Sequence, residues 1–148
     1  MGLFKTKDPL VLRNIIMQHY EKPTQRIDNA KPAPYLNFRN RIESCIDDIT
    51  VFVQVENDTI IDIKFLGTGC AIATASTDIM VEMLNNSTIS DAETLLNEYE
   101  QMLLGNDYNE EMLAELIAFH NIKNQPNRIR CGLNGIVAIK ECLKQYER

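Results

Sequence analysis

The clearest alternation of apolar and polar positions lies in residues 48–67. Two runs rich in β-branched residues flank the dipeptide Asn57-Asp58, which suits a tight turn, so this stretch predicts a β-hairpin. One face of the first strand would carry Ile49, Val51, Val53 and Val55. Phe52 and the odd-numbered apolar residues of the second strand use the other face. Either both faces of the hairpin are covered or the register is off by one residue.

A helix and a loop are predicted before the hairpin. Asp8 followed by Pro9 is a helix start signal, and the helical pattern runs to about Tyr20. The residues expected on its buried side are Leu10, Ile15, Ile16 and Tyr20. Residues 21–40 hold three of the five prolines and are expected to form an extended loop.

Helical signals dominate after the hairpin. Small residues favour a helix from Cys70 to about Leu84. Residues 90–93 (SDAE) form a capping box for a second helix, which would run from Asp91 to about Leu104 and close at Gly105.

Two more helices are expected towards the C-terminus, at residues 110–119 and 131–146. Pro126 is expected to interrupt the helical structure between them. Strands that come first and helices that follow indicate an α+β fold, in which a small antiparallel sheet packs with helices. Residues 1–148 are expected to form a single domain.

The charge and the apolar content of the chain argue against two classes of function, nucleic-acid binding and membrane association. The chain has 148 residues and a net charge of −6, and it shows no basic stripe, so we expect no nucleic-acid partner. A protein partner with a basic face suits this charge better. No apolar run is long enough to span a membrane and residues 1–7 lack a signal-peptide core, so we expect a cytoplasmic protein without membrane contact.

Four cysteines carry the candidate chemistry. In a reducing cytosol, metal ligation or thiol chemistry is a better expectation than structural disulfides. With Asn57-Asp58 as a two-residue loop, Cys45 would lie opposite Cys70 at the open end of the hairpin. Asp47 would point to the same side as Cys45, because side chains alternate along a strand. The three side chains are therefore expected to converge.

A second line of reasoning adds Cys131. Cys70 and Cys131 each open a predicted helix, where free amide groups and a partial positive charge favour the thiolate. Arg128 and Arg130 would strengthen this effect at Cys131. Three thiols and the Asp47 carboxylate make a tetrahedral ligand set of the kind that zinc accepts, and unrelated buried cysteines are the alternative.

The remaining cysteine and both histidines receive structural roles. Cys142 lies three helical turns beyond Cys131, roughly 16 Å away, which is too far for one shared metal, so we expect a packing residue. His19 is expected to cap the carbonyl groups at the end of the first helix. His120 is expected to be a surface or capping residue.

Three motifs, in order, resemble those of one family. Residues 67–76 (GTGCAIATAS) resemble a G-x-G-C-x-I-x-x-A-S signature, residues 16–23 (IMQHYEKP) an I-M-x-H-Y-x-x-P stretch, and residues 128–131 (RIRC) an R-I-K-C stretch. Over nearly its whole length the chain is similar to the NifU-like, IscU/SufU family of iron–sulfur cluster assembly proteins.

The SufU branch is the more similar one. Sixty residues separate Cys70 from Cys131, as expected where that branch carries a helical insertion, and Arg130 stands where the IscU branch has a histidine. The resemblance implies a zinc ion held by Cys45, Asp47, Cys70 and Cys131.

The resemblance also implies partners. These are a cysteine desulfurase of the SufS type, from which the protein would accept sulfur, and downstream iron–sulfur assembly proteins.

One departure from the family concerns residues 43–47, which read ESCID where the family has P-T-C-G-D. Ile46 thus adds bulk beside the expected acceptor thiol of Cys45.

Three functions follow as hypotheses. The first is a zinc-dependent sulfur acceptor in which Cys45 takes sulfur from a desulfurase persulfide and Arg128 either orients the docked partner or is a plain surface residue. The second is a scaffold that holds a transient iron–sulfur cluster on the same ligands. The third is a structural zinc module that binds other proteins.

Overall fold

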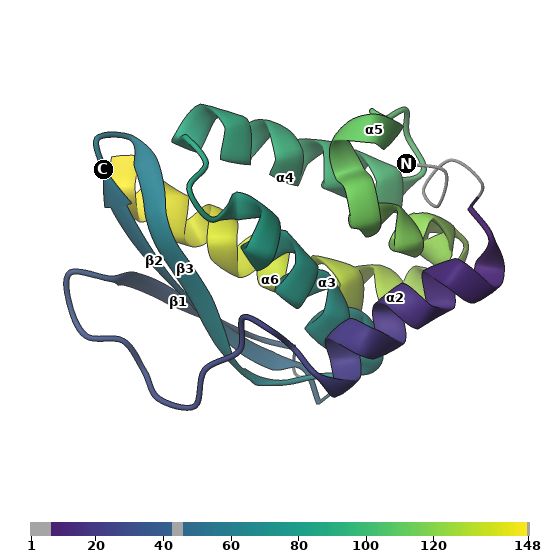
Figure 1. The fold of residues 1–148 in the computed structure, drawn as a ribbon, viewed down its shortest axis with the longest axis horizontal. Helices are drawn as coiled ribbons and strands as arrows, with labels where there is room; N and C mark the ends of the chain where they lie inside the picture. Colours follow the sequence, from purple (N-terminus) through teal and green to yellow (C-terminus); the bar gives the residue numbers. More distant parts are fainter. Residues whose placement is uncertain (1–6, 43–45, 148) are drawn as a thin grey trace.

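The computed structural model describes residues 7–42 and 46–147 of the chain. A three-stranded antiparallel sheet in the order β1-β2-β3 forms one layer, and the helices gather on one side of it (Figure 1). Helix α6 packs on β1 and β2, and helix α3 packs on β3. The expected α+β fold with a small antiparallel sheet is confirmed.

Helix α2 (Pro9–Glu21) begins as predicted. The Asp8 side chain accepts a hydrogen bond from the Leu10 N–H at 2.9 Å, and Pro9 is the first helical residue. Its buried face differs from the expected one, because Leu12 and Ile15 are buried whereas Leu10 is 73% exposed. Leu10 lies roughly 160° from Leu12 around the helix axis, so both cannot face the core. Tyr20 is also exposed.

Strand β1 (Leu36–Arg41) includes the last five residues of the segment that was expected to be loop, so that part of the prediction is wrong. It pairs with β2, with Leu36 opposite Val53. Its even-numbered residues are half-buried and its odd-numbered residues are exposed. Polar and charged residues fill the exposed positions, which hides the strand from a search for apolar runs.

The hairpin is confirmed as β2 (Asp48–Glu56) and β3 (Thr59–Thr68), joined at Asn57-Asp58. Both turn residues have positive φ, at 50° and 59°, as a two-residue type I′ turn requires.

A β-bulge resolves the imperfect alternation. Val55 faces Ile60 as expected, but an irregularity between Gln54 and Val55 shifts the remaining pairs by one, so Val53 faces Ile63. Phe52 is also buried, outside the main core cluster, so both faces of β2 are covered. The expected register is therefore wrong by one residue over Asp48–Gln54, and the expected pairing of Cys45 with Cys70 lies outside the described residues.

Helix α3 (Ala71–Leu84) follows the hairpin, with Cys70 as its N-cap. Helix α4 (Ile89–Leu104) is capped by Thr88, which accepts from the Asp91 N–H at 3.1 Å, and not by Ser90 as predicted. The helix starts two residues earlier because Thr88 satisfies the same kind of free amide. Gly105 closes it in the left-handed conformation, as expected.

The C-terminal third differs from the expectation in two places. The predicted helix at residues 110–119 is a single turn, α5 (Glu110–Leu113), followed by the 3₁₀ segment η1 (Ala114–Asn124). Pro126 starts helix α6 (Pro126–Glu147), since a missing N–H costs nothing in the first turn. Cys131 is thus the sixth residue of α6, and the prediction that it opens a helix is wrong.

Helices α3 and α6 approach each other closely behind the sheet. A Cβ atom added at Gly135 would lie 2.1 Å from Thr77 Oγ1, so only glycine permits this contact. The far end of α6 is fixed at the hairpin turn, where the Tyr146 hydroxyl donates to Asp58 Oδ1 at 2.9 Å. Helix α6 therefore runs along β1 and β2 (Figure 1). Cys131 lies beside Asp47, just before the start of β2.

Within residues 7–42 and 46–147, no helix combines the length and apolar character needed to cross a membrane.

Candidate metal centre

Asp47 is the buried carboxylate of the site. It directly precedes β2 and is 0% exposed. Its backbone carbonyl accepts from the Ile42 N–H at 2.9 Å, which ties the end of β1 to the start of β2. Its side-chain Oδ1 accepts from the Cys70 N–H at 2.7 Å. The carboxylate is therefore held against the first residue before α3.

Cys70 projects from the N-cap of α3. Its Sγ accepts from the Ala73 N–H at 3.4 Å, and its thiol lies 3.8 Å from Asp47 Oδ2. The sulfur at this position accepts a hydrogen bond from one of the free amides at the start of α3. Gly69 leaves space for the carboxylate, because a Cβ there would lie 3.1 Å from Asp47 Oδ1.

Cys131 completes the group from the second turn of α6. One ligand atom from each of Asp47, Cys70 and Cys131 lies within 4.8 Å of the others. Burial raises the pKa of the Cys131 thiol far above its usual range, and the neighbouring Asp47 and Cys70 groups raise this pKa further. Without a cation the Cys131 thiol therefore keeps its proton. A metal ion that displaced this proton would meet one carboxylate and two sulfur donors, so the donor set fits a bound metal ion.

A buried hydrogen-bond network fixes the relative position of the two cysteine-bearing helices. The Tyr99 hydroxyl of α4 donates to the Gly132 carbonyl at 2.9 Å, next to Cys131. The Ser76 hydroxyl of α3 lies 3.5 Å from the same carbonyl. Ser76 thus connects the turn that holds Cys131 to the helix that Cys70 caps, and Tyr99 connects the same turn to α4.

The other predicted site residues lie at the edge of the described structure or outside it. Cys45 falls in residues 43–45, which are outside the described residues, so its place in the ligand set stays a prediction. Ile46 is 73% exposed, although Asp47 beside it is fully buried. Arg128 is exposed one helical turn before Cys131, on a neighbouring part of the α6 surface.

The remaining cysteine has the expected role. Cys142 is fully buried, its thiol lies 3.6 Å from the Val51 carbonyl oxygen, and burial raises its pKa to about 12. It is a packing residue, as predicted. His120 is half-buried and burial lowers its pKa.

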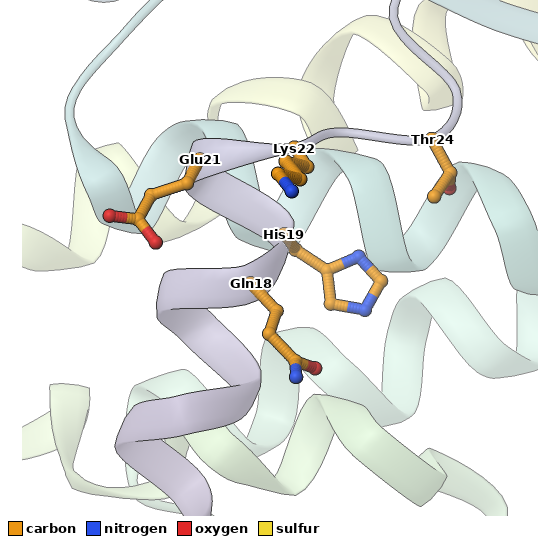
Figure 2. A pocket seen from close by; sticks show the side chains of 5 residues that line it. All are labelled: Gln18, His19, Glu21, Lys22 and Thr24. Carbon is orange, nitrogen blue, oxygen red and sulfur yellow. The ribbon is translucent and has the colours of Figure 1, made fainter.

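His19 does not cap its own helix, so that prediction is wrong. Its Nδ1 lies 2.6 Å from Asp78 Oδ2, on α3. The ring lies beside a surface pocket lined by the end of α2 and the chain that follows it (Figure 2). His19, Asp78 and Glu82 form a second group whose ligand atoms lie within 4.8 Å of one another. Sequence reasoning missed it, because only the helical spacing of Asp78 and Glu82 was visible.

Comparison with known families identifies the fold. Residues 12–148 match the NifU-like N terminal domain. The chain belongs to this family.

The relatives of this NifU-like domain carry two kinds of name. A protein of Thermotoga maritima called iron–sulfur cluster assembly scaffold protein IscU is 34% identical over 105 residues, which cover 71% of this chain and 74% of the relative. A protein of Bacillus subtilis called zinc-dependent sulfurtransferase SufU is 27% identical over 136 residues, covering 91% and 90%.

Solved structures share the architecture. A crystal structure titled putative iron–sulfur cluster assembly scaffold protein for the SUF system, from Fervidobacterium islandicum, has a TM-score of 0.77 at 29% identity and covers 85% of this chain and 91% of its own. A NifU-like protein of Brucella abortus has a TM-score of 0.77 at 18% identity, covering 90% and 92%, and supports the fold alone.

Proposed function

We propose that this NifU-like domain is a zinc-dependent sulfur acceptor that takes persulfide sulfur from a cysteine desulfurase for iron–sulfur cluster biogenesis. The observation that carries the proposal is the convergence of Asp47, Cys70 and Cys131 beside the segment that contains Cys45. The Bacillus subtilis relative, which covers most of both chains, supports it by its name.

The proposed zinc ligands are Cys45, Asp47, Cys70 and Cys131. Zinc accepts sulfur and carboxylate donors in a tetrahedral arrangement, and three donors of that kind already lie within 4.8 Å of one another. When bound, zinc would keep the thiols deprotonated and mask the nucleophilicity of Cys45. The cytosol, where thiols stay reduced, is the compartment that suits this chemistry.

Sulfur transfer would use the Cys45 thiolate as the nucleophile. A side chain of the docked desulfurase would replace Cys45 as a ligand and so free the thiolate. The thiolate attacks the terminal sulfur of the desulfurase persulfide. A new sulfur–sulfur bond forms on Cys45, the bond to the desulfurase cysteine breaks, and that cysteine leaves as a thiolate. Asp47, Cys70 and Cys131 remain in place because separate elements of the fold hold them.

Arg128 is the proposed docking residue. Its exposed guanidinium group lies one turn before Cys131 and could contact a desulfurase surface near the reacting thiol. The Cys45 persulfide would then pass to a downstream assembly protein.

A scaffold for a transient iron–sulfur cluster is the second candidate. The Thermotoga relative bears that name, and three thiolates with one carboxylate can hold a labile cluster. Arg130 stands where the scaffold branch has a histidine, which favours the sulfur acceptor. A structural zinc module explains the ligands. It does not explain why the site is flanked by the solvent-exposed Ile46.

The test is a desulfurase assay with the metal-loaded protein. We expect about one zinc at the sulfur site, no visible absorbance, and a rise in cysteine turnover that fails with Cys45→Ala or after chelation. The matched control, Cys142→Ala, should still stimulate turnover. A brown protein with iron and acid-labile sulfide would favour the scaffold instead. No stimulation, together with unfolding by a chelator, would favour the structural module.

A further inference from the structure

A second set of metal-ligating groups lies at the junction of α2 and α3. His19 ends α2, and its Nδ1 is 2.6 Å from Asp78 Oδ2. Glu82 follows Asp78 by four residues on α3, so both carboxylates share one helix face. One ligand atom from each of the three residues lies within 4.8 Å of the others. The set contains one imidazole nitrogen and two carboxylates, and no sulfur.

The surrounding hydrogen bonds orient these groups. Asp78 Oδ1 accepts from the Gln25 N–H at 2.7 Å, and Oδ2 accepts from the Thr24 N–H at 3.1 Å. On the other side of the ring, His19 Nε2 lies 3.5 Å from Glu115 Oε1. Metal-binding histidines commonly donate their second ring N–H to a carboxylate. With Nε2–H turned towards Glu115, Nδ1 could bind an ion once the proton that it shares with Asp78 is lost.

An ion can reach this place from solvent. Glu82 is exposed, and the imidazole lies beside the pocket lined by Gln18, His19, Glu21, Lys22 and Thr24 (Figure 2). Thr24 Oγ1 lies 3.4 Å from Asp78 Oδ2 and 3.3 Å from Glu82 Oε2, so this hydroxyl would either turn away from a bound ion or offer it a further oxygen. Water from the pocket could fill the coordination positions that the protein leaves open.

A hydrogen-bonded latch between α2 and α3 is the competing interpretation. It accounts for the contacts of Asp78 with His19 and with the two amides. It does not account for the gathering of three carboxylates, those of Asp78, Glu82 and Glu115, around a single imidazole. Lys22 lines the adjacent pocket, but the three carboxylates outnumber that cationic group, which favours a cation among them.

We propose that His19, Asp78 and Glu82 form a second metal site, which takes a divalent first-row ion with nitrogen and oxygen ligands. Imidazole with carboxylates suits zinc, cobalt and manganese better than magnesium or calcium. The ion must replace the proton between His19 and Asp78, so this site binds more weakly than the sulfur site. The proposal goes beyond the sulfur-transfer function and does not depend on it.

The test is a titration of the metal-free, full-length chain with Co²⁺. Thiolate ligands give intense sulfur-to-cobalt charge-transfer absorption in the near ultraviolet, whereas nitrogen and oxygen ligands give only weak visible bands. We expect a first equivalent with charge transfer and a weaker second equivalent without it. Glu82→Gln and His19→Gln should abolish the second equivalent and keep the first. Both variants spare Asp78, whose amide contacts support the fold.

Two further variants keep the result decisive. Glu93→Gln, an exposed change on α4, should retain both equivalents. Cys131→Ser should weaken the charge-transfer equivalent and leave the second one intact, so failure of the sulfur site is distinguishable from failure of this one. A single equivalent in the unmodified chain would overturn the proposal in favour of the latch. So would a second equivalent that persists in both Glu82→Gln and His19→Gln.

Discussion

Helix α3 contributes to two clusters that differ in how well the protein alone stabilises them. Asp47, beside the N-cap of α3, accepts one backbone N–H and faces two thiols. Asp78, about 12 Å further along the same helix, accepts two backbone N–H groups and pairs with His19. Both carboxylates are fully buried. The sulfur cluster therefore has few protein partners and gains stability from an added cation, whereas the second cluster already has protein partners and can bind a cation only by exchange.

The largest expected effect is the loss of a sulfur ligand. Cys131→Ser should lower the zinc affinity of the first cluster by about a hundredfold or more, because a hydroxyl is a poor replacement for a buried thiolate. Competition with a chromophoric chelator measures this affinity.

Cys142→Ser is the matched control for that measurement. It changes the same atom on the same helix, but Cys142 packs under β2 away from the cluster. Zinc affinity should stay within about twofold of the unmodified chain, as expected for a site more than 10 Å away. Equal losses in both variants would mean that the cysteines act on the fold and not on the metal.

Local signals predicted those parts of the fold that neighbouring residues decide. The turn at Asn57-Asp58 could be predicted because both residues tolerate positive φ, and Gly105 could be predicted as a helix end for the same reason. Strand β1 could not be predicted, because Leu36 and Phe38 are its only apolar residues and its partner strand lies further along the chain. Tertiary pairing decides such a strand.

The candidate site was predictable from chemistry more than from register. Asp47, Cys70 and Cys131 do converge, although the bulge shifts the register and Cys131 lies inside α6. The convergence survives because the pairing of Asp48 with Thr68 still brings Asp47 to Cys70, and the close approach of α3 and α6 brings Cys131 to them. The contact between His19 and Asp78 spans 59 residues and leaves no local pattern.

The next prediction compares the free energies of unfolding after removal of each buried carboxylate. In metal-free protein, Asp78→Ala should lower the free energy of unfolding by about 3 kcal/mol, because two part-buried amides and an imidazole lose their acceptor. Asp47→Ala should cost less than half of that, since one amide loses its acceptor while the charge next to Cys131 disappears. Urea unfolding of both variants, followed by circular dichroism, gives the difference.

Zinc should reverse that order. With the metal bound, Asp47→Ala loses a ligand, so its unfolding free energy should fall further below that of the unmodified chain. If Asp47→Ala is already the more damaging change in metal-free protein, the contrast between the two clusters is wrong.

The smallest effect concerns Asn134, one turn beyond Cys131 on α6. Its side chain is fully buried, and neither of its polar atoms has a hydrogen-bond partner among the described residues. Asn134→Leu should raise the free energy of unfolding of the metal-free protein by about 1 kcal/mol, because a side chain of similar size removes two unsatisfied buried groups. Thermal unfolding measures the gain. An unchanged or lower stability would show that a buried water forms hydrogen bonds with this amide. The buried polar groups near Cys131 would then have more hydrogen-bond partners than the protein alone provides.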